Sequence, residues 1–511
     1  MTTFTLHTLP RRARPLLPSA LVLALAACAS SGGLQPQGRL LDADTLHSER
    51  TLATSDLAVA GFPARDWWRG FGDPQLDALV AEALAGHPSL DAADARLRQA
   101  QAQAGIAHAD RLPSLSVSGG YTGVRLPESM VGDEMGGHYL GSGQVAFDFS
   151  YGFDLWGGKR ASWEAAVDGV HAATIDAQAA RLNLSAGVVR AYVELDRAWQ
   201  ANDVAEQELE RAGKTLQLVR QRRAAGIDSA LQVRQAEARI PAAQQQLQAA
   251  QQQIDAARTA LAALLGRGPD RGLSIERPQA LNAAALQLPG VLPSELLGRR
   301  PDVVAARWRV EAAGKQVKVA ETRFYPSFNL TALAGVVAPG VGDLLESSST
   351  FAYLGPALSL PIFDGGRLRA NLAGADAQYD LAVAGYNQTV IDALHEVADQ
   401  VNSPPSDLTW AEVADQVNAV RSLEQQVQSQ QQAVDSAGAA FDLAGQRYRA
   451  GIGSYLDVLG AQAQLLAAQQ LQVALHAQRL LAAARLSQAL GGGFEPDADA
   501  RLSHSSVSPH S

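Results

Sequence analysis

The chain has 511 residues, of which 47% are hydrophobic and 18% are charged, and its formal net charge at pH 7 is -10. A chain this long and this apolar is neither one small core nor a disordered polymer. The negative balance argues against a nucleic-acid partner. No apolar run reaches the roughly 18 residues of a membrane-spanning helix, so any entry into a membrane requires strands that close into a barrel.

Residues 1–27 have the pattern of an export signal: a basic region, a short apolar core, and an ending in Leu-Ala-Ala before Cys28. This ending resembles the bacterial lipobox, in which the cysteine is acylated and becomes the new N-terminus. Cys28 is the only cysteine, so the chain has no intrachain disulfide and one predicted lipidation site. An ordinary signal peptide with a chance cysteine is the alternative. Ala29, where an aspartate usually retains lipoproteins in the inner membrane, favours the outer membrane.

The first half of the mature chain predicts a strand-and-helix unit. After a polar leader over 28–66, helical patterns begin at Trp67, and the first strand is expected over 114–124. A second strand is expected over 143–156, because apolar and small or acidic residues alternate strictly from Val145 to Leu155. Long helices follow over 159–225 and 228–265, and the first of them is about 100 Å long at 1.5 Å per residue.

The second half repeats this unit. Three anchors recur in the same order, at offsets of 213, 208 and 225 residues, so we divide the chain into repeat 1 (67–266), repeat 2 (267–493) and a polar tail (494–511). The predicted elements of repeat 2 are strands over 327–337 and 351–363 and long helices over 366–450 and 454–490.

The change of offset has a visible cause in the sequence. The heptapeptide EVADQVN begins at Glu396 and again at Glu412, and Pro404-Pro405 lies between the copies. Because proline cannot continue a helix, residues 403–418 are interpreted as an insertion in the long helix over 366–450.

Four strands per chain determine the predicted assembly. Four strands cannot close a barrel, and open sheet edges are not tolerated in lipid. Subunits must therefore share one barrel, and a cyclic trimer supplies twelve strands. The fold class predicted is mainly α with a membrane β-barrel of twelve strands shared by a trimer.

The lipobox, the duplicated strand–helix units and the segment RYRAGIGSYLDVL together resemble the outer-membrane factors of bacterial efflux pumps, in particular the lipoprotein branch that serves resistance-nodulation-division transporters. The resemblance covers roughly residues 60–493. It implies a homotrimer in outer-membrane lipid, whose trimeric twelve-stranded barrel is continued by a periplasmic α-helical barrel. It also implies a periplasmic adaptor protein that docks on the helix tips, and an inner-membrane transporter of that class as the third partner.

The turns between the long helices are the strongest functional candidates. Gly226 and Gly451 need no function as hairpin turns, because glycine readily adopts the left-handed conformation that ends a helix. The resemblance makes them the periplasmic tips for adaptor docking, and it places Tyr448, Leu456 and Asp457 at or near the aperture. In a trimer Asp457 would form a ring of three carboxylates, bridged by donors such as the Tyr448 hydroxyl or Arg449. Gly460 departs from relatives that carry an acid there.

The sequence contains no catalytic constellation, metal-ligand cluster or cofactor motif, so no enzyme activity and no cofactor beyond the covalent lipid on Cys28 are expected. The predicted function is the passive exit duct of a tripartite efflux pump that exports small molecules such as antibiotics. The alternatives are an outer-membrane duct for protein secretion and a lipid-anchored coiled-coil structural protein. The structural protein would not need alternating strands.

Overall fold

The computed structural model describes residues 33–41, 62–132, 136–282, 297–340, 342, 344, 346–402 and 419–495. These fall into two compact units, unit 1 within 1–40, 98–172 and 306–386 and unit 2 within 41–97, 173–305 and 387–511. Each unit takes segments from both sequence repeats. Cys28 and the insertion over 403–418 lie outside the described residues.

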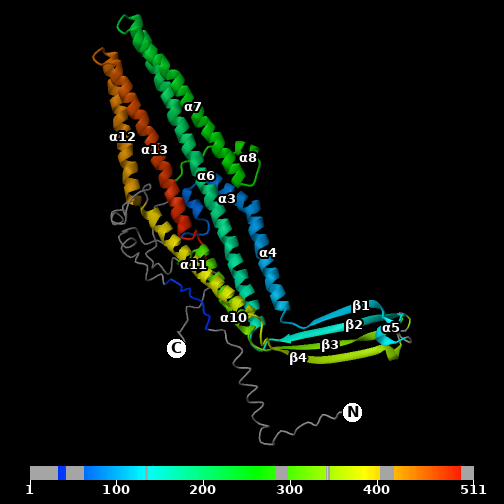
Figure 1. The fold of residues 1–511 in the computed structure, drawn as a ribbon. Helices are drawn as coiled ribbons and strands as arrows, with labels where there is room; N and C mark the ends of the chain where they lie inside the picture. Colours follow the sequence, from blue (N-terminus) through cyan, green and yellow to red (C-terminus); the bar gives the residue numbers. More distant parts are fainter. Residues whose placement is uncertain are drawn as a thin grey trace. The chain divides into compact units, whose positions relative to one another are not determined.

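Unit 1 contains an antiparallel sheet in the order β1-β2-β3-β4 (Figure 1). Its strands are β1 (Ser114–Arg125), β2 (Tyr139–Phe153), β3 (Ser327–Ala338) and β4 (Thr350–Ser359). Three ends differ by more than one residue from those expected, and the first is the start of β2, at Tyr139 rather than at 143. β2 ends at Phe153 rather than at 156, and β4 ends at Ser359 rather than at 363, where Pro361 has no N–H for a ladder.

The sheet has a more apolar face and a more polar face, and the difference is clearest in β1 and β2. Phe149 of β2 lies opposite Leu115 of β1 and Ala332 of β3, whereas its neighbour Ser150 lies opposite Ser114 and Thr331. Since side chains alternate between faces, this register puts most apolar residues of β1 and β2 on the Phe149 side. In β3 and β4 apolar residues lie on both sides, because Leu333, Val337, Phe351 and Tyr353 share the face of Ser150. The outer edges of β1 and β4 pair with no other strand among the described residues.

Both strand-to-helix bends are built in the same way. The Asp154 carboxylate accepts hydrogen bonds from the backbone N–H groups of Lys159 and Arg160, at 3.0 and 2.8 Å. The Asp364 carboxylate accepts from those of Gly366 and Leu368, at 3.0 and 2.7 Å. Each aspartate satisfies free donors at the start of a helix, so the duplicated sequence makes a duplicated bend.

Two helical hairpins follow from the bends. The first consists of α6 (Gly158–Ala224) and α7 (Ala230–Leu264), and the second of α12 (Ala419–Arg449) and α13 (Tyr455–Ala489) (Figure 1). α11 (Arg367–Asn402) precedes the insertion, and α7 continues through Pro241 as one helix. The remaining elements are η2 (Trp67–Phe71), α3 (Pro74–Gly86), α4 (Pro88–Ala109), α5 (Glu128–Val131), α8 (Asp270–Leu273), α10 (Pro301–Thr322) and η4 (Ser347–Ser349).

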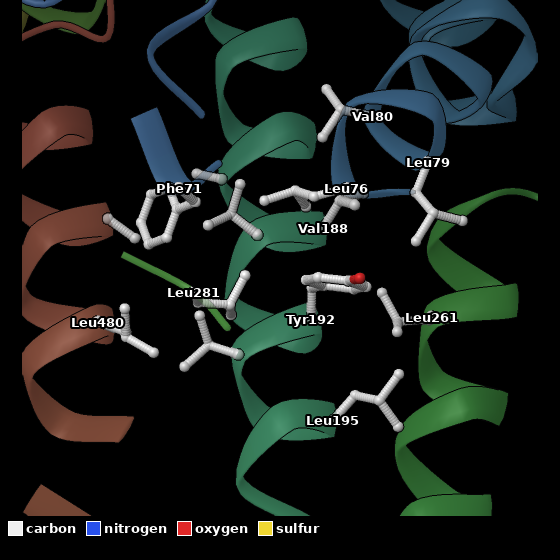
Figure 2. Close-up of a cluster of buried hydrophobic side chains, with 14 of the residues drawn as sticks. Phe71, Leu76, Leu79, Val80, Val188, Tyr192, Leu195, Leu261, Leu281 and Leu480 are labelled. Atoms are coloured by element: carbon white, nitrogen blue, oxygen red, sulfur yellow. The ribbon is translucent and has the colours of Figure 1, made fainter. Parts of the chain in front are cut away.

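The main apolar core lies in unit 2. Figure 2 shows α3, α6, α7 and α13 contributing buried side chains to it, among them Leu76, Val188, Leu261 and Leu480. The Tyr192 hydroxyl donates to the Asp73 carboxylate in this core, at 2.6 Å. No helix in the described part of the chain combines the length and apolarity needed to cross a membrane.

Candidate functional site: the tips of the helical hairpins

The turns of the two hairpins have matching geometry. Gly226 and Gly451 have φ values of 76° and 79°, the left-handed region that glycine adopts without strain. Ser229 caps α7 in a capping box with Gln232. Ser454 caps α13: its backbone N–H donates to the Asp457 carboxylate at 2.9 Å, and its hydroxyl accepts from the Asp457 N–H at 3.2 Å. The local sequence therefore fixes both turns.

A polar cluster joins the two hairpins beside these turns. The Arg222 guanidinium donates from Nε to the Asp228 carboxylate at 3.1 Å and from Nη1 to the Tyr448 carbonyl oxygen at 2.6 Å. The Tyr448 hydroxyl donates to the same carboxylate of Asp228. We call these three residues the tip latch. It connects the end of α12 to the α6–α7 turn, so its bonds must break if the two hairpins separate there.

The tip latch is buried. Tyr448 is 2% exposed, and the side chains of Arg222 and Asp228 are 10% and 4% exposed. The Arg222 guanidinium carbon lies 4.3 Å from the centre of the Tyr448 ring, and the Tyr455 ring lies 5.8 Å from it. Val219, Val233 and Val458 complete the apolar surroundings. Burial, together with the bond to Asp228, raises the pKa of the Tyr448 hydroxyl, so it remains a donor at physiological pH.

The residues predicted for the aperture occupy different environments. Tyr448 is buried in the tip latch, Leu456 is 68% exposed, and Asp457 is exposed. Hydrogen bonds from Ser454 lower the pKa of the Asp457 carboxyl. The hypothesis named the Tyr448 hydroxyl and Arg449 as donors to Asp457. Within the chain the Tyr448 hydroxyl bonds Asp228 instead, and Arg449 Nε donates to the Gly445 carbonyl oxygen at 3.3 Å.

Sequence reasoning missed Arg222 and Asp228. The offset of 225 that relates the two turns aligns Asp228 with Gly453, and this exchange of an acid for a glycine was the available signal. It indicated that the first turn has an acidic side chain, and therefore a partner for an arginine, that the second turn lacks.

A second polar network joins the hairpins farther along α6 and α13. The Gln462 amide donates to the buried Glu208 carboxylate at 2.6 Å. Arg211 donates to Glu208 at 3.2 Å and to the Gln469 side-chain oxygen at 2.9 Å. These bonds hold α6 against α13 independently of the tip latch.

The described residues contain no group of three or more histidine, cysteine, aspartate or glutamate side chains placed to hold a metal ion.

Comparisons with known proteins agree on one family. The model of the outer membrane efflux protein family matches residues 79–267, 292–404 and 408–492. The fusaric acid resistance protein FusA of Burkholderia cepacia is 39% identical over 371 residues, covering 70% of this chain and 68% of FusA. The multidrug resistance outer membrane protein MdtP of Escherichia coli K12 is 33% identical over 351 residues, covering 67% of this chain and 72% of MdtP.

A solved structure agrees with these relatives. The outer membrane protein VceC of Vibrio cholerae superposes with a TM-score of 0.76 and 37% identity, covering 85% of this chain and 100% of VceC. The family model spans both repeats, both hairpins and all four strands. The chain therefore belongs to the outer membrane efflux protein family.

Proposed function

We propose that three copies of this outer-membrane efflux protein form one passive exit duct, the outer part of a tripartite pump with a periplasmic adaptor and a resistance-nodulation-division transporter. The observation that carries this proposal is the four-stranded sheet, in which the Phe149 face is the more apolar and the edges of β1 and β4 pair with no other strand among the described residues. An apolar face suits lipid, and a polar face suits a water-filled lumen.

Closure of the sheet requires other copies of the chain. Unpaired N–H and C=O groups at the edges of β1 and β4 are too costly in hydrocarbon. The four strands alternate in direction, so β1 of one copy can pair antiparallel with β4 of the next. Three copies give a twelve-stranded barrel, an even-numbered size within the range of outer-membrane barrels.

The hairpin tips are the proposed gate and docking surface. The tip latch holds the second hairpin to the first through buried, charge-assisted bonds. Leu456 and the turn residues Ile227 and Ile452 are exposed beside it, where an adaptor can contact them. We propose that the closed duct is held by the tip latch with Leu456 and Asp457 near the aperture, and that adaptor docking at Gly226 and Gly451 releases it.

Acylation of Cys28 is proposed as a second attachment to the membrane. The backbone N–H groups of Gln37 and Gly38 donate to the Asp380 carboxylate of α11, at 2.8 and 2.6 Å. Asp380 lies about 20 Å along α11 from Arg367, at the sheet end of the helix. Nine residues separate Cys28 from Gln37 and can span about 30 Å. A lipid on Cys28 can therefore reach the membrane that contains the sheet.

The names of the relatives support a cargo of small toxic molecules. FusA is named for resistance to fusaric acid and MdtP for multidrug resistance. Relatives of this kind favour small-molecule export over protein secretion.

Conductance of purified full-length protein in a planar lipid bilayer tests the duct. We expect stepwise single-channel currents, whereas a coiled-coil structural protein gives none. Deletion of the gene separates the two kinds of duct: small-molecule efflux should fall while the set of secreted proteins stays the same. Loss of secreted proteins with unchanged efflux would assign the chain to protein secretion instead.

A further inference from the structure

The hairpin tips carry a charge opposite to that of the whole chain. Residues 218–240 and 441–463 together contain seven arginines and four carboxylates, a net charge of +3, whereas the full chain carries -10. The arginines are Arg220, Arg222, Arg223, Arg234, Arg239, Arg447 and Arg449. The carboxylates are Asp228, Glu237, Asp442 and Asp457. We call the two segments together the tip region.

Most of these carboxylates are already engaged. Asp228 is buried against Arg222 in the tip latch. Glu237 pairs with Arg220 at 2.9 Å and with Arg234 at 3.1 Å. The Asp457 carboxylate accepts the Ser454 N–H in the helix cap. Arginines therefore neutralise Asp228 and Glu237, whereas the exposed Asp442 and Asp457 keep their charge and are outnumbered by the remaining arginines.

Several arginines remain without an acidic partner. Within the described part of the chain, no carboxylate lies at ion-pair distance from Arg223, Arg447 or Arg449, and all three side chains are exposed. All three lie within a few residues of the turn glycines Gly226 and Gly451. The uncompensated positive charge is thus concentrated at the ends of the hairpins.

The duplication explains why Arg447 lacks the close ion pair of Arg222, although its charge helps to lower the pKa of Asp457. The offset of 225 aligns Arg447 with Arg222 and Gly453 with Asp228, so the second turn keeps the arginine and lacks its acid. A side chain at Gly453 would be crowded: its Cβ would lie 3.0 Å from the Arg447 Cβ and 3.1 Å from the Tyr448 nitrogen. A Cβ at Gly460 would meet no atom within 4 Å, yet this position also lacks an acidic side chain.

We propose that the tip region forms a cationic constriction that admits small anions in preference to cations, with Arg447 as its main free charge. The inference rests on the proposed function, because it needs three tips around one axis. Three copies place three times the net charge of +3 at the narrowest part of the duct. Rings of arginine favour anions in pores, and this field acts within a Debye length of about 10 Å at 0.1 M salt. The substrate class favoured is small organic anions such as carboxylates.

Reversal potentials of the purified full-length trimer in a planar bilayer under a KCl gradient test this proposal. We expect a Cl⁻-to-K⁺ permeability ratio above one for the wild type. Arg447→Gln should lower the ratio, and Arg447→Glu should bring it below one. Arg98→Glu is the matched control, because Arg98 is an exposed arginine of α4 outside the tip region, and its ratio should equal that of the wild type.

The possible outcomes test the cationic constriction separately from the proposed duct function. The absence of any current contradicts the duct. A conducting wild type that prefers K⁺ overturns the cationic constriction and leaves the duct intact. The cationic constriction is also overturned if the Cl⁻-to-K⁺ permeability ratio stays above one and unchanged in both Arg447→Glu and Arg449→Glu. A native gel shows that each variant remains trimeric, and since Arg447 and Arg449 are exposed, we expect both variants to fold.

Discussion

Replacing Tyr448 with phenylalanine removes one bond of the tip latch and little else. The ring stays in its pocket against Arg222 and Tyr455, while the hydroxyl that donates to Asp228 is lost. A hydrogen bond to a charged group contributes about 1.5–3 kcal/mol. If opening breaks this bond, Tyr448→Phe shifts the closed-to-open ratio by roughly 10- to 150-fold per subunit, since about 1.4 kcal/mol is tenfold. Asp228→Asn is a harsher change, because it leaves the Arg222 guanidinium buried without its counter-charge.

Single-channel recording measures this shift. We expect Tyr448→Phe to raise the open probability in a planar bilayer and to make cells sensitive to vancomycin, which the closed duct excludes. Tyr192→Phe is the matched control, because its hydroxyl also donates to a buried aspartate, Asp73, in the main core. It should lower thermal stability without raising the open probability. Equal open probabilities for intact trimers of Tyr448→Phe and wild type would refute the gating role of the tip latch.

Three further changes test other parts of the account. Cys28→Ser should abolish labelling with a radioactive fatty acid while the barrel still inserts, and persistent label would show that the lipid is elsewhere. Deletion of 403–418 should leave trimers that insert into the membrane, since it restores nearly equal spacing of the repeats. Loss of trimers would show that the segment is needed for packing. Loss of efflux with trimers intact would indicate that the segment contacts the adaptor. Burial raises the pKa of Asp196 to about 6, so the folded protein binds this proton more tightly than the unfolded chain, and stability falls as pH rises from about 4 to about 6. Asp196→Asn should remove this cost of about 3 kcal/mol and flatten the dependence of the unfolding midpoint between about pH 4 and pH 6; an unchanged slope would contradict it.

Local periodicity accounts for what the sequence predicted well. Alternation from Val145 onward has period two, and the structure has β2 (Tyr139–Phe153) there. The ends are less certain from sequence because capping decides them. Asp154 leaves the strand pattern to cap α6, which the alternation alone does not reveal.

Contacts between distant segments account for what the sequence missed. Tyr448 and Asp228 are 220 residues apart, so no local pattern brings them together. The compact units also differ from the repeats, because each is assembled from pieces of both repeats. A duplication identifies equivalent residues, such as Arg222 and Arg447, but only packing shows which of them keeps a partner.

The central claim is that β1 of one chain pairs with β4 of the next and that three chains close the ring. Cysteines placed at Ser116 on β1 and at Ala357 or Ser359 on β4, in a Cys28→Ser background, test it directly. All three positions belong to the polar face in the observed register. Oxidation of the inserted protein should give covalent dimers and trimers on a denaturing gel and no larger species. Ser116→Cys alone should stay monomeric, because β1 faces β4 of the next chain, which then carries no cysteine. Two results would contradict the shared twelve-stranded barrel. One is that both cysteine pairs give only monomers, and the other is a ladder of covalent species with more than three chains.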